Sequence, residues 1–175
     1  MATSLLQTHF FSVVHRQPAS FREVAVDPQV MTPSGQPFDV LFVGTNHGKI
    51  LKIVNTADVE DYAKKPVFVE EIGVFPKTVS IRKLQVVRTE REVPRLLIMT
   101  SDELVSIPVS RCGVAKHCHV CVGLKDPYCA WDNDVGRCTN LYDEAPTVNA
   151  AAFLQNVVTG VHKYFYCLYP YINII

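Results

Sequence analysis

The chain has 175 residues, enough for one ordinary domain or for one domain with a small satellite. Hydrophobic residues make up 48% of it and charged residues 19%, a balance typical of folded proteins rather than disordered ones. Lys and Arg together number 17, as do Asp and Glu, so no basic surplus exists to neutralise phosphates, and no nucleic-acid partner is expected.

Neither end of the chain has the pattern of a targeting or membrane segment. The N-terminus lacks a Lys/Arg-rich start and polar residues 7–9 interrupt its apolar run, so no signal peptide is predicted. No run of about 18 apolar residues occurs, so no complete membrane span is predicted. Residues 164–175 are strongly apolar but too short to cross a bilayer.

The first segment of the chain predicts short β-strands joined by turns. Four stretches have strand length and are either apolar or alternate between apolar and polar residues. They are residues 21–27, 38–44, 49–54 and 67–72. Asp27-Pro28 is a turn signal after the first, a loop with two prolines fills 31–37, and Asn46 and Gly48 favour a tight hairpin.

The pattern then restarts at residue 81, which indicates a repeated unit. Residues 81–87, 95–100 and 104–109 match the first three strands, with a charged loop at 89–92 and a turn at 101–103. The repeat length corresponds to about one β-propeller blade with enlarged loops. The second unit has three strands, because a cysteine-rich segment begins where the fourth should follow. An N-terminal strand outside this chain would close such a ring, and two blades without neighbours should be unstable alone.

All six cysteines follow Arg111. They are Cys112, Cys118, Cys121, Cys129, Cys138 and Cys167. Because all six cysteines are clustered there, the C-terminal segment is about one-tenth cysteine, which is the composition of a disulfide scaffold. A domain of roughly 55 residues builds little core, so covalent bridges are expected there. Disulfides in turn place the chain outside the cell.

Two other chemistries remain open for these cysteines. In the pair Cys118-x2-Cys121, the first cysteine lies between His117 and His119 in the sequence. This arrangement suggests a zinc site or a redox CxxC. Zinc sites usually combine two such pairs, and the second pair is missing. Structural disulfides are the preferred interpretation, with no metal ligand and no cofactor expected.

The run CVGLKDPYCAWD at residues 121–132 resembles the signature of the PSI (plexin–semaphorin–integrin) domain. Upstream, FDVLFVGTNHGK at 38–49 and LIMTSDELVSIP at 97–108 resemble the last two blades of a semaphorin sema domain. Residues 26–30 and 153–160 are also similar to this family. The resemblance covers roughly residues 10 to 167 and is greatest to invertebrate transmembrane semaphorins.

The resemblance implies an all-β chain with two domains. Residues 1–110 would be the last two blades of a seven-bladed sema β-propeller, 111–167 a PSI-like domain, and 168–175 a divergent tail. It also implies the disulfide pairs Cys112–Cys129, Cys121–Cys138 and Cys118–Cys167. Four residues of the signature are expected to be structural, in a turn or packed on a disulfide: Asp126, Pro127, Tyr128 and Trp131.

The resemblance further implies an extracellular guidance ligand that binds a plexin receptor in axon guidance and cell migration. The full-length family member forms a homodimer, and in the family its receptor and dimer surfaces lie mainly on blades upstream of this chain. The alternative is part of a plexin-like receptor, since plexins carry the same modules. An enzyme such as a small zinc hydrolase is a remote third interpretation. No nucleophile elbow or paired-carboxylate motif occurs, so no catalytic residue or small-molecule substrate is expected.

Overall fold

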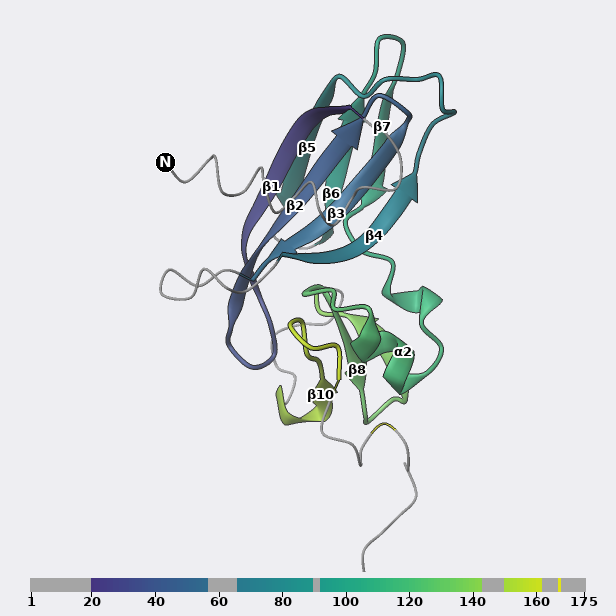
Figure 1. Cartoon of the computed structure of the whole chain (residues 1–175). Helices are drawn as coiled ribbons and strands as arrows, with labels where there is room; N and C mark the ends of the chain where they lie inside the picture. The colour runs from purple at the N-terminus through teal and green to yellow at the C-terminus, as the bar shows by residue number, and fades with distance from the viewer. Residues whose placement is uncertain (1–19, 57–65, 90–91, 143–149, 162–166, 168–175) are drawn as a thin grey trace, which may run out of the picture. The chain divides into compact units, whose positions relative to one another are not determined.

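A computed structural model describes residues 20–56, 66–89, 92–142, 150–161 and 167. These residues form three small sheets with strand orders β1-β2-β3-β4, β5-β6-β7 and β10-β8-β9 (Figure 1). They divide into two compact units. The first takes the described residues within 1–29, 39–87 and 95–107, and the second takes those within 30–38, 88–94 and 108–175. The predicted all-β class is confirmed, while the expectations for the N-terminal segment and the tail at 168–175 lie outside the described residues.

The first sheet is the predicted four-stranded unit. Its strands are β1 (Phe21–Met31), β2 (Pro37–Thr45), β3 (Lys49–Asn55) and β4 (Val67–Gly73). β3 pairs with both β2 and β4 in the antiparallel sense, and its register with β4 shifts between Lys52 and Ile53. Residues 57–65, between β3 and β4, lie outside the described residues.

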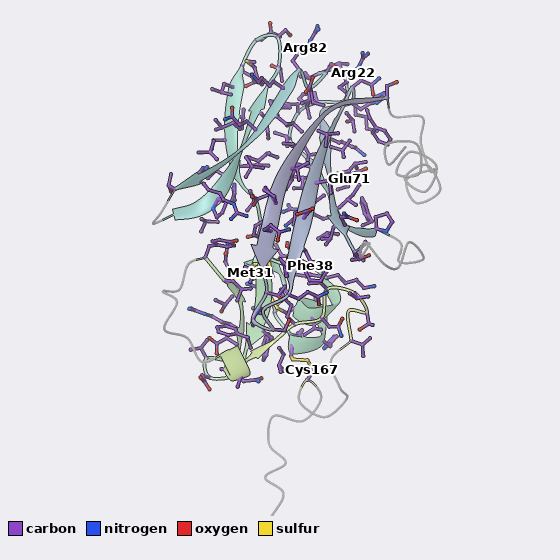
Figure 2. The ribbon with its side chains drawn as sticks, turned by 90° about the vertical axis from the view of Figure 1, so that its left-hand side faces the viewer. Arg22, Met31, Phe38, Glu71, Arg82 and Cys167 are labelled. Atoms are coloured by element: carbon purple, nitrogen blue, oxygen red, sulfur yellow. A yellow bond between two sulfur atoms is a disulfide. The ribbon has the colours of Figure 1, made fainter. Side chains whose placement is uncertain are left out.

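The first strand continues past the turn predicted at Asp27-Pro28, so that prediction is wrong. β1 runs on to Met31, and Gln29 takes a left-handed conformation with φ 56°. The backbone N–H of Gln29 donates to Asp39 Oδ1 at 3.0 Å, which holds this irregular residue against the neighbouring strand. The chain therefore bends without leaving the sheet. Figure 2 shows Met31 and Phe38 on the two strands flanking the actual turn.

The second sheet has the three strands that the sequence predicts. They are β5 (Lys83–Thr89), β6 (Glu92–Met99) and β7 (Leu104–Pro108). The Arg95 guanidinium on β6 reaches β7, where Nε donates to Ser106 Oγ at 2.7 Å and Nη2 donates to Ser106 O at 2.9 Å. This pair of hydrogen bonds ties the two strands together on their exposed side.

The same threonine-capped turn occurs in both sheets, which supports the predicted repeat. Thr45 Oγ1 accepts from the N–H groups of His47 and Lys49 and donates to Lys49 O. Thr100 Oγ1 accepts from two N–H groups of the next turn and donates to Glu103 O. Each hydroxyl satisfies backbone groups that the ladder leaves unpaired at a strand end. The two hairpins are thus built alike although their turn sequences differ.

The central strands of the first sheet are apolar on both faces. Val43, Leu51 and Ile53 form a buried cluster on one face. Gly44 is one residue along from Val43 and so faces the other way, where a Cβ would lie 2.8 Å from Ile81 Cγ2. Ile81 and Leu84 belong to the second repeat, and the Ile81 N–H donates to Thr45 O at 3.1 Å. Gly44 therefore marks a close approach between the two repeats within the first unit.

A charged residue, Lys52, lies inside this packing. Its side chain is fully buried, and its Nζ lies 5.9 Å from the centre of the Phe42 ring. Phe42 is its register partner on β2, so the ammonium group faces an aromatic ring directly across the ladder. Lys52 is enclosed because β3 is buried on both faces.

We expect the substitution Gly44→Ala to destabilise the first unit by about 1–3 kcal/mol, because the new methyl group overlaps Ile81 and forces the two repeats apart. Gly73→Ala on β4 is the matched control, since a Cβ there meets nothing within 4 Å and should change stability by less than about 1 kcal/mol. Urea unfolding of the purified full chain gives both values. Equal effects for the two substitutions would contradict the close approach at Gly44.

Candidate functional site

The cysteine module is the most specific feature of the described chain. Its elements are η1 (Cys112–Val114), α2 (Cys118–Gly123), β8 (Cys129–Asp132), β9 (Arg137–Asn140), η2 (Ala150–Ala152) and β10 (Phe153–Leu154). β8 is central, antiparallel to both β9 and β10. The sequence did not predict α2. A helix of this length is marginal in water, so its two disulfides supply stability that its sequence lacks.

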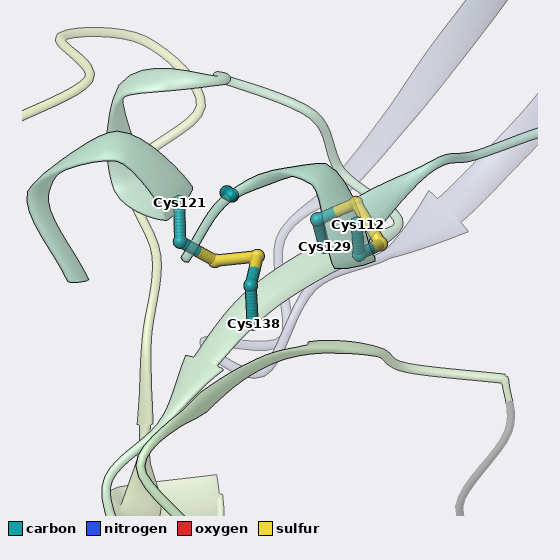
Figure 3. Close-up of a cluster of buried hydrophobic side chains, with 5 residues drawn as sticks. Cys112, Cys121, Cys129 and Cys138 are labelled. Atoms are coloured by element: carbon teal, nitrogen blue, oxygen red, sulfur yellow. A yellow bond between two sulfur atoms is a disulfide. The ribbon is translucent and has the colours of Figure 1, made fainter. Parts of the chain in front are cut away.

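All six cysteines are paired in the structure. The pairs are Cys112–Cys129, Cys121–Cys138 and Cys118–Cys167. Figure 3 shows the first two pairs beside each other, with Cys121 on α2 and Cys138 on β9. The pairs span 17, 17 and 49 residues. In the chain-entropy account these loops contribute about 3 kcal/mol for each short one and about 4 kcal/mol for the long one.

Trp131 joins two apolar clusters of this module. On one side it packs against the cluster that contains Cys112, Cys121, Cys129 and Cys138. On another it packs against the cluster of Cys118, Val122 and Leu154. Its register partner on β9 is Cys138, so the indole sits directly across from a cystine sulfur. The large ring thus supplies core volume that so small a domain otherwise lacks.

The signature residues 126–128 form a buried turn that leads into β8. Lys125 enters it with a positive φ of 56°, and the Asp126 carboxylate accepts the Tyr128 N–H at 3.1 Å. Asp126 O accepts the Cys129 N–H at 3.0 Å and closes the turn. Asp126, Pro127 and Tyr128 are all buried, and Tyr128 is completely enclosed. Their place is therefore inside the module rather than on a ligand-accessible surface.

Gln155, a residue that the sequence analysis did not single out, holds this turn by hydrogen bonds from its side-chain amide, called here the Gln155 clasp. Its Nε2 lies 2.9 Å from Asp126 O, 3.0 Å from Pro127 O and 2.8 Å from Cys129 O. Carbonyl oxygens only accept hydrogen bonds, so the amide nitrogen must face all three. Gln155 follows β10 in the chain and lies more than two dozen residues from its acceptors. No local pattern marks such a residue.

Aspartate also shapes the hairpin between β8 and β9. Asp132 Oδ1 accepts from the N–H groups of Asp134 at 2.8 Å and Val135 at 3.2 Å. Gly136 adopts the left-handed φ of 65° that the turn needs, and its N–H donates to Asp132 O. The last residue of the signature is thus the cap of a turn that brings Cys138 back beside Trp131.

The second unit includes strand ends from the propeller repeats together with the cysteine module. Arg88, at the end of β5, places its guanidinium carbon 5.7 Å from the ring centre of Tyr142. The Tyr142 ring lies 5.8 Å from that of Tyr128, tilted by 49°. Asn140 Nδ2 donates to Ser110 Oγ at 2.7 Å. Arg88, Tyr142 and Tyr128 therefore form one continuous series of contacts that ends at the buried signature turn.

The two histidines beside the CxxC pair lie on the surface. The rings of His117 and His119 stack with centres 5.9 Å apart, and both residues are exposed. The two cysteines of the CxxC pair, Cys118 and Cys121, both form disulfides, so neither has a free thiol. Within the described ranges no three His, Cys, Asp or Glu side chains come together in a group able to hold a metal ion.

Across the part of the chain that the structure covers, no helix has both the length and the apolar character to cross a membrane.

Propeller-blade sheets followed by a three-disulfide module with a buried Asp-Pro-Tyr turn define a protein of the sema–PSI class. Family models agree with both parts. The Sema domain model matches residues 2–88, and the model named PSI, described as Plexin repeat, matches residues 111–156. Together they cover most of the chain. Strands β1 to β4 fall within the Sema match, and five of the six cysteines fall within the PSI match, while β6, β7 and Cys167 lie outside both.

The chain belongs to the semaphorin family. It is 40% identical over 146 residues to semaphorin-1A of Schistocerca americana, covering 82% of this chain and 20% of that protein. The solved extracellular domains 1–2 of Drosophila semaphorin 1a are 41% identical with a TM-score of 0.70, covering 85% of this chain and 29% of that one. The chain is also similar to the solved structure of Drosophila plexin A in complex with semaphorin 1b, with 30% identity and a TM-score of 0.67. This match covers 81% of this chain and 28% of the chain in that structure. This chain therefore spans about a fifth of the length of the curated relative it matches.

We expect Gln155→Met to destabilise the cysteine module by about 2–3 kcal/mol, because it leaves three carbonyls around the buried turn without their shared donor. Gln29→Met is the matched control. The Gln29 side chain makes one exposed hydrogen bond, at 3.3 Å to Asp39, so its loss should cost less than about 0.5 kcal/mol. Thermal unfolding of both variants measures the difference. Equal stability of the two proteins would show that the clasp contributes nothing.

Proposed function

We propose that this chain is part of an extracellular guidance ligand that acts by binding a plexin receptor. The main observation behind this proposal is that both the propeller blades and the cysteine module match semaphorins. One of these semaphorins has been solved in complex with plexin A. Identities of 40% and 41% to semaphorin-1A proteins favour the ligand interpretation over a plexin-like receptor. Axon guidance and cell migration are the processes that the family resemblance implies.

The proposed organisation follows the sequence. Residues 1–110 are assigned to the C-terminal part of a sema domain, 111–167 to a PSI-like domain and 168–175 to a divergent tail. The three disulfides and the residues Asp126, Pro127, Tyr128 and Trp131 are assigned a structural role. The burial of Asp126, Pro127 and Tyr128 and the packing of Trp131 against the cystines support this role. The role needs no catalysis, because a guidance ligand works through surface recognition. Disulfide bonds and solved extracellular relatives favour a location outside the cell.

Receptor binding is proposed for the longer parent protein rather than for this chain alone. The chain spans 20% of semaphorin-1A, and the family's receptor and homodimer surfaces lie mainly on upstream blades. Binding energy in protein interfaces is concentrated in a few residues near the centre of the contact. A piece without those residues keeps little of the affinity.

We therefore predict that the parent ectodomain binds an immobilised plexin ectodomain and that this chain alone binds at least about a hundredfold more weakly. Surface-binding measurements on both proteins provide the test, with the parent after reduction and alkylation as the unfolded control. A parent ectodomain that fails to bind any plexin would overturn the proposed function. Nanomolar binding by the isolated chain would instead overturn the upstream location of the receptor surface.

A further inference from the structure

The three disulfides of the module lie in two different environments. Cys112, Cys121, Cys129 and Cys138 belong to one buried cluster, and none of them exceeds 7% exposure. The Cys118–Cys167 bond differs, because Cys118 is 7% exposed but Cys167 is only partly buried at the margin of a separate cluster. Figure 2 labels Cys167 on the cysteine module. It is the one cysteine of the six that solvent reaches appreciably.

The described chain before Cys167 is anchored without this bond. β10 pairs with β8 through Phe153 and Leu154, and Gln155 clasps the signature turn. Asn156 closes the next turn, where its Oδ1 accepts the Thr159 N–H and its Nδ2 donates to Val161 O. The ladder, the clasp and this turn hold residues 153–161 in place. Opening the Cys118–Cys167 bond would therefore leave the rest of the module folded.

We propose that Cys167 is a thiol-exchange site, modified by small extracellular thiols of the glutathione class. The reagent thiolate attacks the Sγ of Cys167, the more exposed residue of the pair, and forms a mixed disulfide there. The Cys118–Cys167 bond breaks, and its electron pair leaves on Cys118 Sγ, which takes up a proton from water. One disulfide is thus exchanged for another, and the reagent supplies the only thiol that is consumed.

The consequence is a local release. After exchange, α2 no longer holds Cys167, while the two buried disulfides keep the helix and the β8–β9 hairpin together. The site would therefore control whether Cys167 is attached to the module. The exchange depends on the exposure of Cys167 and on the extracellular location, and it is independent of plexin binding.

Graded reduced glutathione tests the proposal on the purified chain of 175 residues. After acid quenching and alkylation, peptide mass mapping reads each cysteine separately. We expect glutathione on Cys167 and a free thiol on Cys118 at a concentration at least about tenfold below that which opens either buried pair. At that concentration the fluorescence of Trp131, the single tryptophan, should remain that of the folded module.

A double variant, Cys118→Ser with Cys167→Ser, is the control and should take up no glutathione over the same range while keeping both buried disulfides. The wild-type map decides the proposal even if this variant fails to fold. Opening of all three bonds together, earlier opening of a buried pair, or glutathione found on Cys118 rather than Cys167 would each overturn it.

Discussion

The packing of two cystines against Trp131 is the interaction on which the cysteine module depends. So few residues bury little apolar surface, and folding must offset the conformational entropy of every ordered residue. Cys112–Cys129 and Cys121–Cys138 reduce that entropy in the unfolded chain and at the same time form the core on which the indole packs. Helix α2, the signature turn and the β8–β9 hairpin are short elements that this core holds together.

A different constraint governs the propeller repeats. In the first sheet the central strands β2 and β3 are buried on both faces, so that sheet must be covered on two sides, as expected of stacked repeats. Gly44 allows the close approach on one face, where Ile81 occupies the space that a side chain would fill. The fully buried Lys52 shows how complete this covering is on β3. Stability in this unit is therefore a property of neighbouring sheets rather than of any one hairpin.

Features set by local sequence could be predicted, and features set by distant contacts could not. Alternation and turn residues located all seven strands of the two repeats, because strand patterns act over adjacent residues. The end of β1 was misplaced, since the Gln29–Asp39 hydrogen bond that carries the strand past Pro28 is tertiary. Helix α2 went unpredicted because disulfides rather than helix propensity stabilise it. Gln155 carries no local signal, since all its acceptors lie in a remote turn.

Non-reducing peptide mapping of the untreated full chain tests the central claim most directly. The account predicts three linked peptide pairs, which join Cys112 to Cys129, Cys121 to Cys138 and Cys118 to Cys167. Free thiols at these positions, or a metal ion bound in place of the disulfides, would contradict both the structural basis of the module and the extracellular assignment that follows from it.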